Sequence, residues 1–84
     1  MYKIKLTKTA FKQIGFLKAS NLFKKAASLI EIIKINPYEA PVEKLKGDLQ
    51  GCFSKRINIQ HRLVYSVNEE AKAITIISCF GHYE

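Results

Sequence analysis

The 84-residue chain has room for one domain, and a composition of 48% hydrophobic residues with four glycines and two prolines predicts a packed core rather than disorder. Fourteen lysines and arginines oppose seven acidic residues, and the resulting net charge of +7 favours phosphate-rich partners. No run of 18 apolar residues occurs and no apolar segment follows the first lysines, so we expect neither a membrane span nor a signal peptide, and a cytoplasmic protein.

The N-terminal half predicts one strand followed by two helices. Lysine alternates with Tyr2, Ile4 and Leu6, which is the period-two pattern of a strand with one buried face. Thr7 or Thr9 can cap a short helix whose apolar residues are interrupted by Gly15 and by the polar pair at 20–21. A second helix is expected over residues 21–35, and Asn36-Pro37 should end it. Its apolar stripe consists of Leu22, Ala26, Leu29, Ile30 and Ile33.

The C-terminal half predicts a β-meander. Residues 38–48 indicate a loop or weak strand, and strands are expected over residues 53–59, 63–67 and 73–80. Helices that follow the first strand and strands gathered afterwards predict an α+β fold. We expect residues 1–84 to form one domain, with two N-terminal helices packed on an antiparallel sheet.

The charge indicates a class of partner, and the spacing of the cysteines argues against a metal site, but neither identifies a reaction. Residues 1–28 contain seven lysines and no acidic residue, which predicts a positive face. This face could bind nucleic acid or a ribosome, or could simply keep the protein soluble, and charge alone leaves both open. Cys52 and Cys79 have no metal-ligand spacing and lie in apolar surroundings, so we expect core thiols and neither a metal nor a cofactor.

Cleavage of RNA without a metal needs a base for the 2'-hydroxyl, cations for the phosphorane and an acid for the leaving oxygen. Candidates for these roles are Glu43, Arg56, Arg62, His82 and Tyr83. Each also has an ordinary interpretation as a solvated carboxylate, a surface cation or a frayed chain end. His61, at a strand boundary, is better interpreted as a turn residue than as the proton donor.

The order of several short motifs is more specific than any single residue. Pro-Tyr-Glu at 37–39, Glu-Lys-Leu-Lys at 43–46, Ser-Lys-Arg-Ile at 54–57, His-Arg-Leu-Val-Tyr at 61–65 and His-Tyr at 82–83 follow one another along the chain. In this order they resemble the YoeB/Txe toxins of the RelE superfamily, and the resemblance covers essentially the whole chain. Lys44 stands where that family usually has proline, Phe53 where it has tryptophan, and Glu84 extends the usual terminal tyrosine.

The resemblance implies a microbial-RNase-like fold and a toxin that cleaves mRNA in the ribosomal A site. It also implies neutralisation by an acidic antitoxin of the YefM/Axe type, and it leaves a homodimer open. By the same resemblance, Glu43 is the general base, Arg62 stabilises the phosphorane, His82 is the general acid and Tyr83 completes the site. The cations expected to contact or orient phosphate are Lys46, Lys55 and Arg56.

Two other functions remain open from the sequence. The first is a non-catalytic basic inhibitor on the same fold, which binds RNA or the ribosome or poisons gyrase as some relatives do. Those gyrase poisons generally lack the terminal His-Tyr pair that this chain has. The second is a DNA-binding regulator, which is disfavoured because no helix-turn-helix pattern is present.

Overall fold

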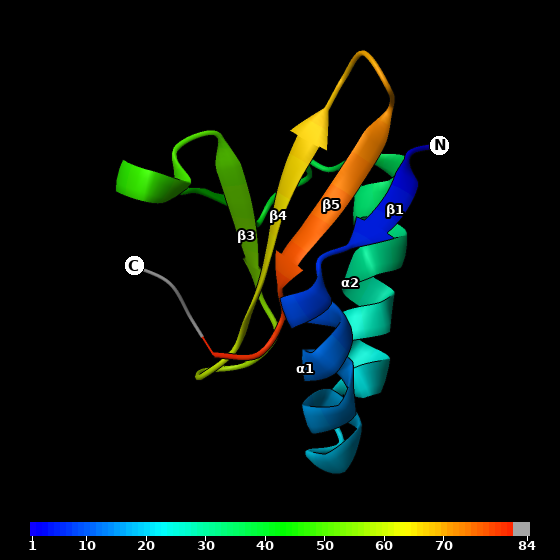
Figure 1. The fold of residues 1–84 in the computed structure, drawn as a ribbon, viewed down its shortest axis with the longest axis vertical. Coiled ribbons are helices and arrows are strands. Elements are labelled where there is room, and N and C mark those ends of the chain that lie inside the picture. Colours follow the sequence, from blue (N-terminus) through cyan, green and yellow to red (C-terminus); the bar gives the residue numbers. More distant parts are fainter. Residues whose placement is uncertain (82–84) are drawn as a thin grey trace.

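The computed structural model describes residues 1–81, which form two helices and a five-stranded sheet (Figure 1). The elements, in chain order, are β1 (Lys3–Leu6), α1 (Lys8–Ala19), α2 (Phe23–Ile35), β2 (Glu43–Lys44), the short 3-10 helix η1 (Gly47–Leu49), β3 (Cys52–Arg56), β4 (Arg62–Asn68) and β5 (Ala73–Ser78). The predicted α+β fold is confirmed.

The sheet has the strand order β1-β5-β4-β3-β2 and is mixed. Strands β2 to β5 pair antiparallel with their neighbours, as predicted, whereas β1 pairs parallel with β5. The expectation of a wholly antiparallel sheet is therefore wrong at this edge. A parallel pair cannot be joined by a tight turn, and here the chain between β1 and β5 contains both helices and strands β2 to β4.

Local sequence explains the helix boundaries. The Thr7 hydroxyl accepts a hydrogen bond from the Ala10 amide at 3.0 Å and so caps α1. The helix continues through Gly15, where an interruption was expected, and ends before Asn21, whose φ of 60° is incompatible with a continuing right-handed helix. Helix α2 ends at Ile35, before Asn36-Pro37, as predicted.

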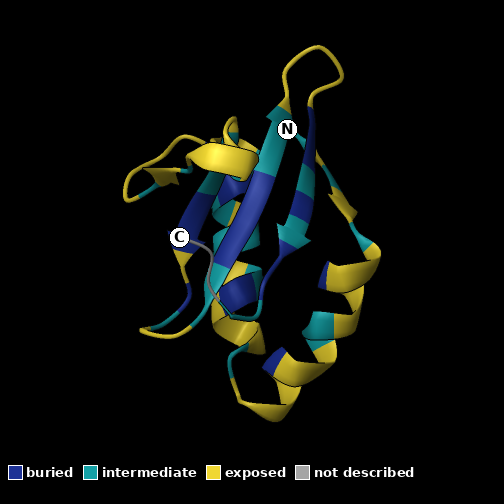
Figure 2. Cartoon of the chain, turned by 60° about the vertical axis from the view of Figure 1, so that its left-hand side comes forward, coloured by how far each residue is buried: buried dark blue, intermediate teal, exposed yellow. Residues whose placement is uncertain are grey.

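The core lies between the helices and one face of the sheet (Figure 2). Its members include Ala10, Leu17, Ala26, Ile33, Leu63, Tyr65, Ile74 and Ile76. The phenol of Tyr65 is fully buried and donates a hydrogen bond to the carbonyl oxygen of Pro37 at 2.6 Å. Burial raises the pKa of this phenol to about 12, because the ionised form would lose its hydration.

Two predicted strands are shorter than expected. Strand β3 stops at Arg56 because the amides of Ile57 and Asn58 both donate to the carbonyl oxygen of His61, which forms the turn into β4. Strand β5 stops at Ser78. Cys79 is a free, buried thiol whose pKa is raised by burial to about 11, whereas Cys52, also free, is half-buried. No helix in the described part of the chain is long and apolar enough to cross a membrane.

Candidate active site

The central feature of the site is an ion pair between Glu43 and Arg62. Glu43 on β2 is the register partner of Ser54 on β3, and Arg62 on β4 is the partner of Arg56, two residues further along β3. Because side chains alternate along a strand, all four project from the same face of the sheet. This face is opposite the helices, since the intervening residue Leu63 lies in the core. Here Arg62 Nη1 lies 2.9 Å from Glu43 Oε1 and 3.5 Å from Ser54 Oγ.

This ion pair is accessible to a ligand. The Glu43 side chain is 60% exposed and that of Arg62 is 20% exposed. The carboxylate is the more exposed partner, so an incoming phosphate can reach the Arg62 guanidinium from the side of Glu43. The planar fork of a guanidinium suits two phosphate oxygens as well as it suits a carboxylate.

The described chain ends next to Arg62. The amide of Arg62 donates to the carbonyl oxygen of Gly81 at 2.9 Å, which ties the last described residue to the start of β4. His82 and Tyr83, the other two expected catalytic residues, lie outside the described residues. The structure therefore brings together two of the four expected catalytic side chains.

His61 has a role in the turn and at the chain end, in line with its interpretation from the sequence. Its amide donates to Asn58 Oδ1 at 2.8 Å, and its Nδ1 accepts the Gly81 amide at 2.7 Å. The imidazole stacks on the ring of Phe80 with a centroid distance of 4.0 Å. Since Nδ1 accepts a hydrogen bond here, the imidazole cannot donate a proton from that nitrogen.

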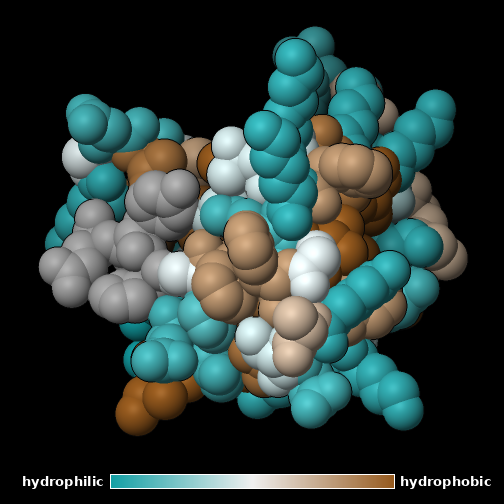
Figure 3. Space-filling model, turned by 60° about the horizontal axis from the view of Figure 1, so that its bottom comes forward, coloured by the Kyte–Doolittle hydropathy of each residue, from teal (hydrophilic) through white to brown (hydrophobic). Residues whose placement is uncertain are grey.

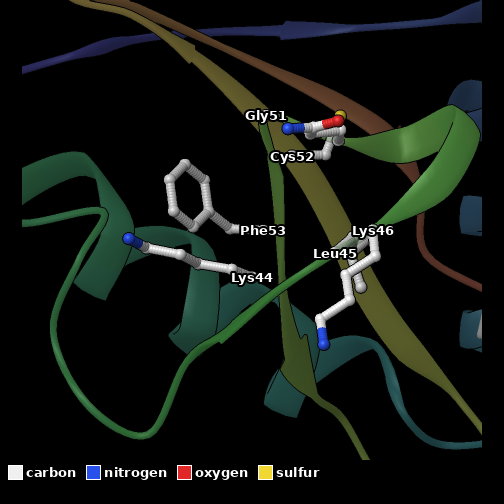
Figure 4. Close-up of a pocket in the computed structure, with 7 residues that line it drawn as sticks. Lys44, Leu45, Lys46, Gly51, Cys52 and Phe53 are labelled. Atoms are coloured by element: carbon white, nitrogen blue, oxygen red, sulfur yellow. The ribbon is translucent and has the colours of Figure 1, made fainter.

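The expected phosphate-contacting cations lie in different surroundings. Lys46 is exposed and, with Lys44 and Phe53, lines a cavity of about 660 Å³ beside η1 (Figure 4). Arg56 is exposed and lines a separate cavity of about 320 Å³ together with Glu43. That cavity also contacts Leu29 and Ile32 of α2, so it is the register pairing of Arg56 with Arg62 that puts Arg56 on the face of the ion pair, while Lys46 lies at the other cavity.

Lys55 does not fit the phosphate-binding role expected from the sequence. Only 4% of the residue is exposed, and its ammonium group donates to the carbonyl oxygens of Glu39 at 2.6 Å and Pro41 at 3.0 Å. It alternates with Ser54 and Arg56, so it projects from the opposite face of β3. A buried ammonium needs such partners, and its function is to hold the loop before β2.

All seven lysines of residues 1–28 are exposed, two of them on β1 (Lys3 and Lys5) and five on the helices. Lysines at the outer positions of α1 and α2 are exposed, namely Lys8, Lys12, Lys18, Lys24 and Lys25. At the end of the molecule shown in Figure 3, hydrophilic side chains project around a smaller apolar area. Within residues 1–81, no group of three or more His, Cys, Asp or Glu side chains is gathered as a metal site would require.

Comparison with solved structures defines the class of protein. A YoeB/ParE toxin from Agrobacterium tumefaciens superposes with a TM-score of 0.88 at 30% identity, covering 96% of this chain and 99% of that one. A YoeB-YefM complex from Staphylococcus aureus matches with a TM-score of 0.83 at 36% identity and 99% coverage of both chains. A YoeB dimer from the same organism matches equally well, at 36% identity over 98% of both chains. The fold is that of the small RelE-superfamily toxins.

Sequence comparison identifies the family within that class. The family described as "YoeB-like toxin of bacterial type II toxin-antitoxin system" matches residues 6–83. A toxin YoeB from Synechocystis is 40% identical over 65 residues, which is 75% of this chain and 73% of that protein. The chain belongs to the YoeB-like toxins, as the motif order predicted.

Proposed function

We propose that the protein is a ribosome-dependent endoribonuclease that inhibits translation by cutting mRNA in the ribosomal A site. The observation that carries the proposal is the contact between Glu43 and Arg62 at 2.9 Å on the open face of the sheet. A carboxylate and a guanidinium at this distance can reach the 2'-hydroxyl and the phosphate of one nucleotide together.

In the proposed reaction, Glu43 removes the proton from the 2'-hydroxyl, and the resulting oxygen attacks the adjacent phosphorus. Arg62 donates hydrogen bonds to the phosphorane, whose added negative charge it stabilises. His82 gives a proton to the departing 5'-oxygen, with Tyr83 completing the site, and the products are a 2',3'-cyclic phosphate and a 5'-hydroxyl. Arg56, beside the ion pair, and Lys46 bind neighbouring phosphates.

Two features support the roles of the chain end and the basic surface. The bond between the Gly81 carbonyl and the Arg62 amide brings the last described residue to the backbone of Arg62, and the proposed His82 follows that residue directly in the sequence. The exposed lysines of both helices provide sequence-independent attraction to the phosphates of a large RNA particle. Such a substrate would require the protein to act in the cytoplasm.

The proposed partner that restrains the toxin is an acidic antitoxin of the YefM type. The family membership supports an antitoxin, and one of the matching structures is a YoeB-YefM complex from Staphylococcus aureus. The net charge of +7 favours fast association with an acidic partner, with a rate that falls as salt rises. Homodimerisation is proposed on the same basis, from the matching YoeB dimer.

The test uses ribosomes programmed with a defined mRNA. Primer extension should reveal new 5' ends when the wild-type protein is added, and Glu43→Gln, Arg62→Met or His82→Gln should lower the single-turnover cleavage rate by about 10² to 10⁴-fold. Ribosome binding by each variant should change far less than the cleavage rate. A matched control is Glu31→Gln, since Glu31 is an exposed carboxylate on α2 whose one ion pair within residues 1–81 is with Lys34.

The rival function predicts a different pattern. If the protein inhibits translation without generating new 5' ends, and the three variants inhibit as strongly as the wild type, it is a non-catalytic basic inhibitor. In that case, inhibition should depend on the exposed lysines of the helices and should weaken steeply with salt.

A further inference from the structure

The segment after β5 is held by one side chain from α1. Gln13 Oε1 accepts the amides of Cys79 at 2.7 Å and Phe80 at 3.2 Å, and Gln13 Nε2 donates to the Phe80 carbonyl at 3.3 Å. These three backbone groups lie past the last residue of β5, so a side-chain carboxamide replaces the missing sheet partner.

A second side chain, from the turn before β4, holds the next residue. His61 Nδ1 accepts the Gly81 amide at 2.7 Å, and its ring stacks on Phe80 at an interplanar angle of 20°. The Phe80 ring also lies 5.2 Å from that of Phe16 on α1. Residues 79–81 are thus fixed from both sides, by α1 and by the β3–β4 turn.

Gly81 has a backbone conformation that gives the segment its exit direction. Its φ is 88°, a region that residues with a Cβ rarely adopt. With its amide bound to His61 and its carbonyl bound to the Arg62 amide, both polar groups of this peptide position are satisfied. Gly81 is therefore held by a side chain from the β3–β4 turn and by the backbone of Arg62.

We propose that Gln13 and His61, together termed the tail clamp, are positioning residues: they fix residues 79–81, and the catalytic role proposed for His82 depends on that fixed segment. This inference rests on the proposed function and extends it to two residues whose side chains form no part of the Glu43–Arg62 ion pair. A displacement of a reacting group by about 1 Å can lower a rate by about 10²-fold, so the clamp acts on the cleavage step rather than on binding.

The experiment combines amide hydrogen exchange with cleavage kinetics on programmed ribosomes. Gln13→Leu removes all three contacts to residues 79 and 80, and His61→Phe keeps an aromatic ring against Phe80 but removes the Gly81 acceptor. We expect both to expose the amides of residues 79–81 to exchange and to lower kcat by about 10²-fold with little change in KM.

Two further variants separate positioning from folding. In His61→Asn, the side-chain oxygen lies about where Nδ1 lies in histidine, so slow exchange at Gly81 and much of kcat should return. Gln60→Leu removes the same carboxamide as Gln13→Leu from an exposed position in the same turn as His61, and should match the wild type in both measurements.

The outcomes distinguish the clamp from the nuclease function. Variants that retain slow exchange at residues 79–81, or that lose it and still cleave at the wild-type kcat, overturn the positioning role alone. A wild-type protein that protects these amides and yet cuts no mRNA overturns the nuclease function, and the positioning role with it. Loss of protection with a matching loss of kcat, restored by His61→Asn, supports the clamp.

Discussion

Arg62 on β4 is the direct register partner of Arg56 on β3, so two guanidinium groups project side by side from the open face of the sheet. Only Arg62 is paired with a carboxylate among the described residues, through Glu43. Like charges directly opposite each other destabilise an antiparallel pair. A phosphate between them would relieve that repulsion, which is the arrangement expected of a binding site for a polyanion.

Replacing Arg56 should therefore raise the stability of the fold and lower the proposed cleavage activity. Arg56→Gln removes the repulsion and should raise the free energy of unfolding in urea by about 0.2–1 kcal/mol. The same change should slow mRNA cleavage, because one phosphate contact is lost. Arg56→Lys keeps the charge and should leave stability near that of the wild type. A stability loss in Arg56→Gln without any change in cleavage would contradict this account.

Replacement of Lys55 should affect stability and not RNA binding, whereas replacement of Lys46 should affect RNA binding and not stability. Lys55→Met keeps an unbranched apolar stem but leaves two carbonyl oxygens without their buried donor, and should lower the free energy of unfolding by about 1–3 kcal/mol. RNA binding should keep its salt dependence in this variant. In Lys46→Met, the free energy of unfolding should change by less than about 0.5 kcal/mol. The slope of log affinity for RNA against log salt concentration should fall in magnitude by about 1. Equal salt slopes in the two variants would contradict the assignment.

Periodicity predicted the helices and the three longer strands because each has an apolar pattern that only one regular structure satisfies. The alternation of β3 also contained the correct information about Lys55, which lies out of phase with Arg56. Lys55 was nevertheless expected to bind phosphate, because the family resemblance implies a cation at this position. Its partners are carbonyl groups of the loop before β2, and no local sequence pattern indicates them.

The contacts at the end of the chain could not be predicted in the same way. Gln13 is an ordinary polar residue of an amphipathic helix, and its role depends on where β5 ends and on how α1 lies beside it. The parallel pairing of β1 with β5 is also a property of the whole topology. The sequence indicates side chains with reactive groups, but it contains no local signal for a side chain such as Gln13 that binds backbone groups of a distant segment.

The stability of the fold should depend on the hydroxyl group of Tyr65. Tyr65→Phe removes the bond to the Pro37 carbonyl while retaining the buried ring, so the free energy of unfolding should fall by about 0.5–1.5 kcal/mol. Urea denaturation with an unchanged m-value would measure this. Tyr2→Phe is the control, because the Tyr2 hydroxyl bonds at an exposed position and its loss should matter less. An equal effect in the two variants would contradict the prediction.

Glu69 connects three segments at the far end of the sheet from the α1–α2 turn. Its carboxylate accepts hydrogen bonds from Tyr38, from Lys72 at 2.9 Å and from Tyr2 at 2.9 Å. These donors, Tyr38 first, lower the pKa of Glu69 from 4.5 to about 2. About half of the Glu69 side chain is exposed (47%), so salt should weaken the effect.

The lowered pKa of Glu69 predicts the sign of a pH effect on stability. A carboxyl group with a lower pKa in the folded state than in the unfolded state stabilises the fold above pH 4.5, and that contribution disappears as the pH falls towards about 2. Glu69→Gln should therefore be less stable than the wild type at pH 6, and the difference should shrink between pH 4.5 and 2. Urea unfolding at several pH values measures it, with the neighbouring exposed Glu70→Gln as control. A difference that stays constant across this range would show that the hydrogen-bonded carboxylate has no such role.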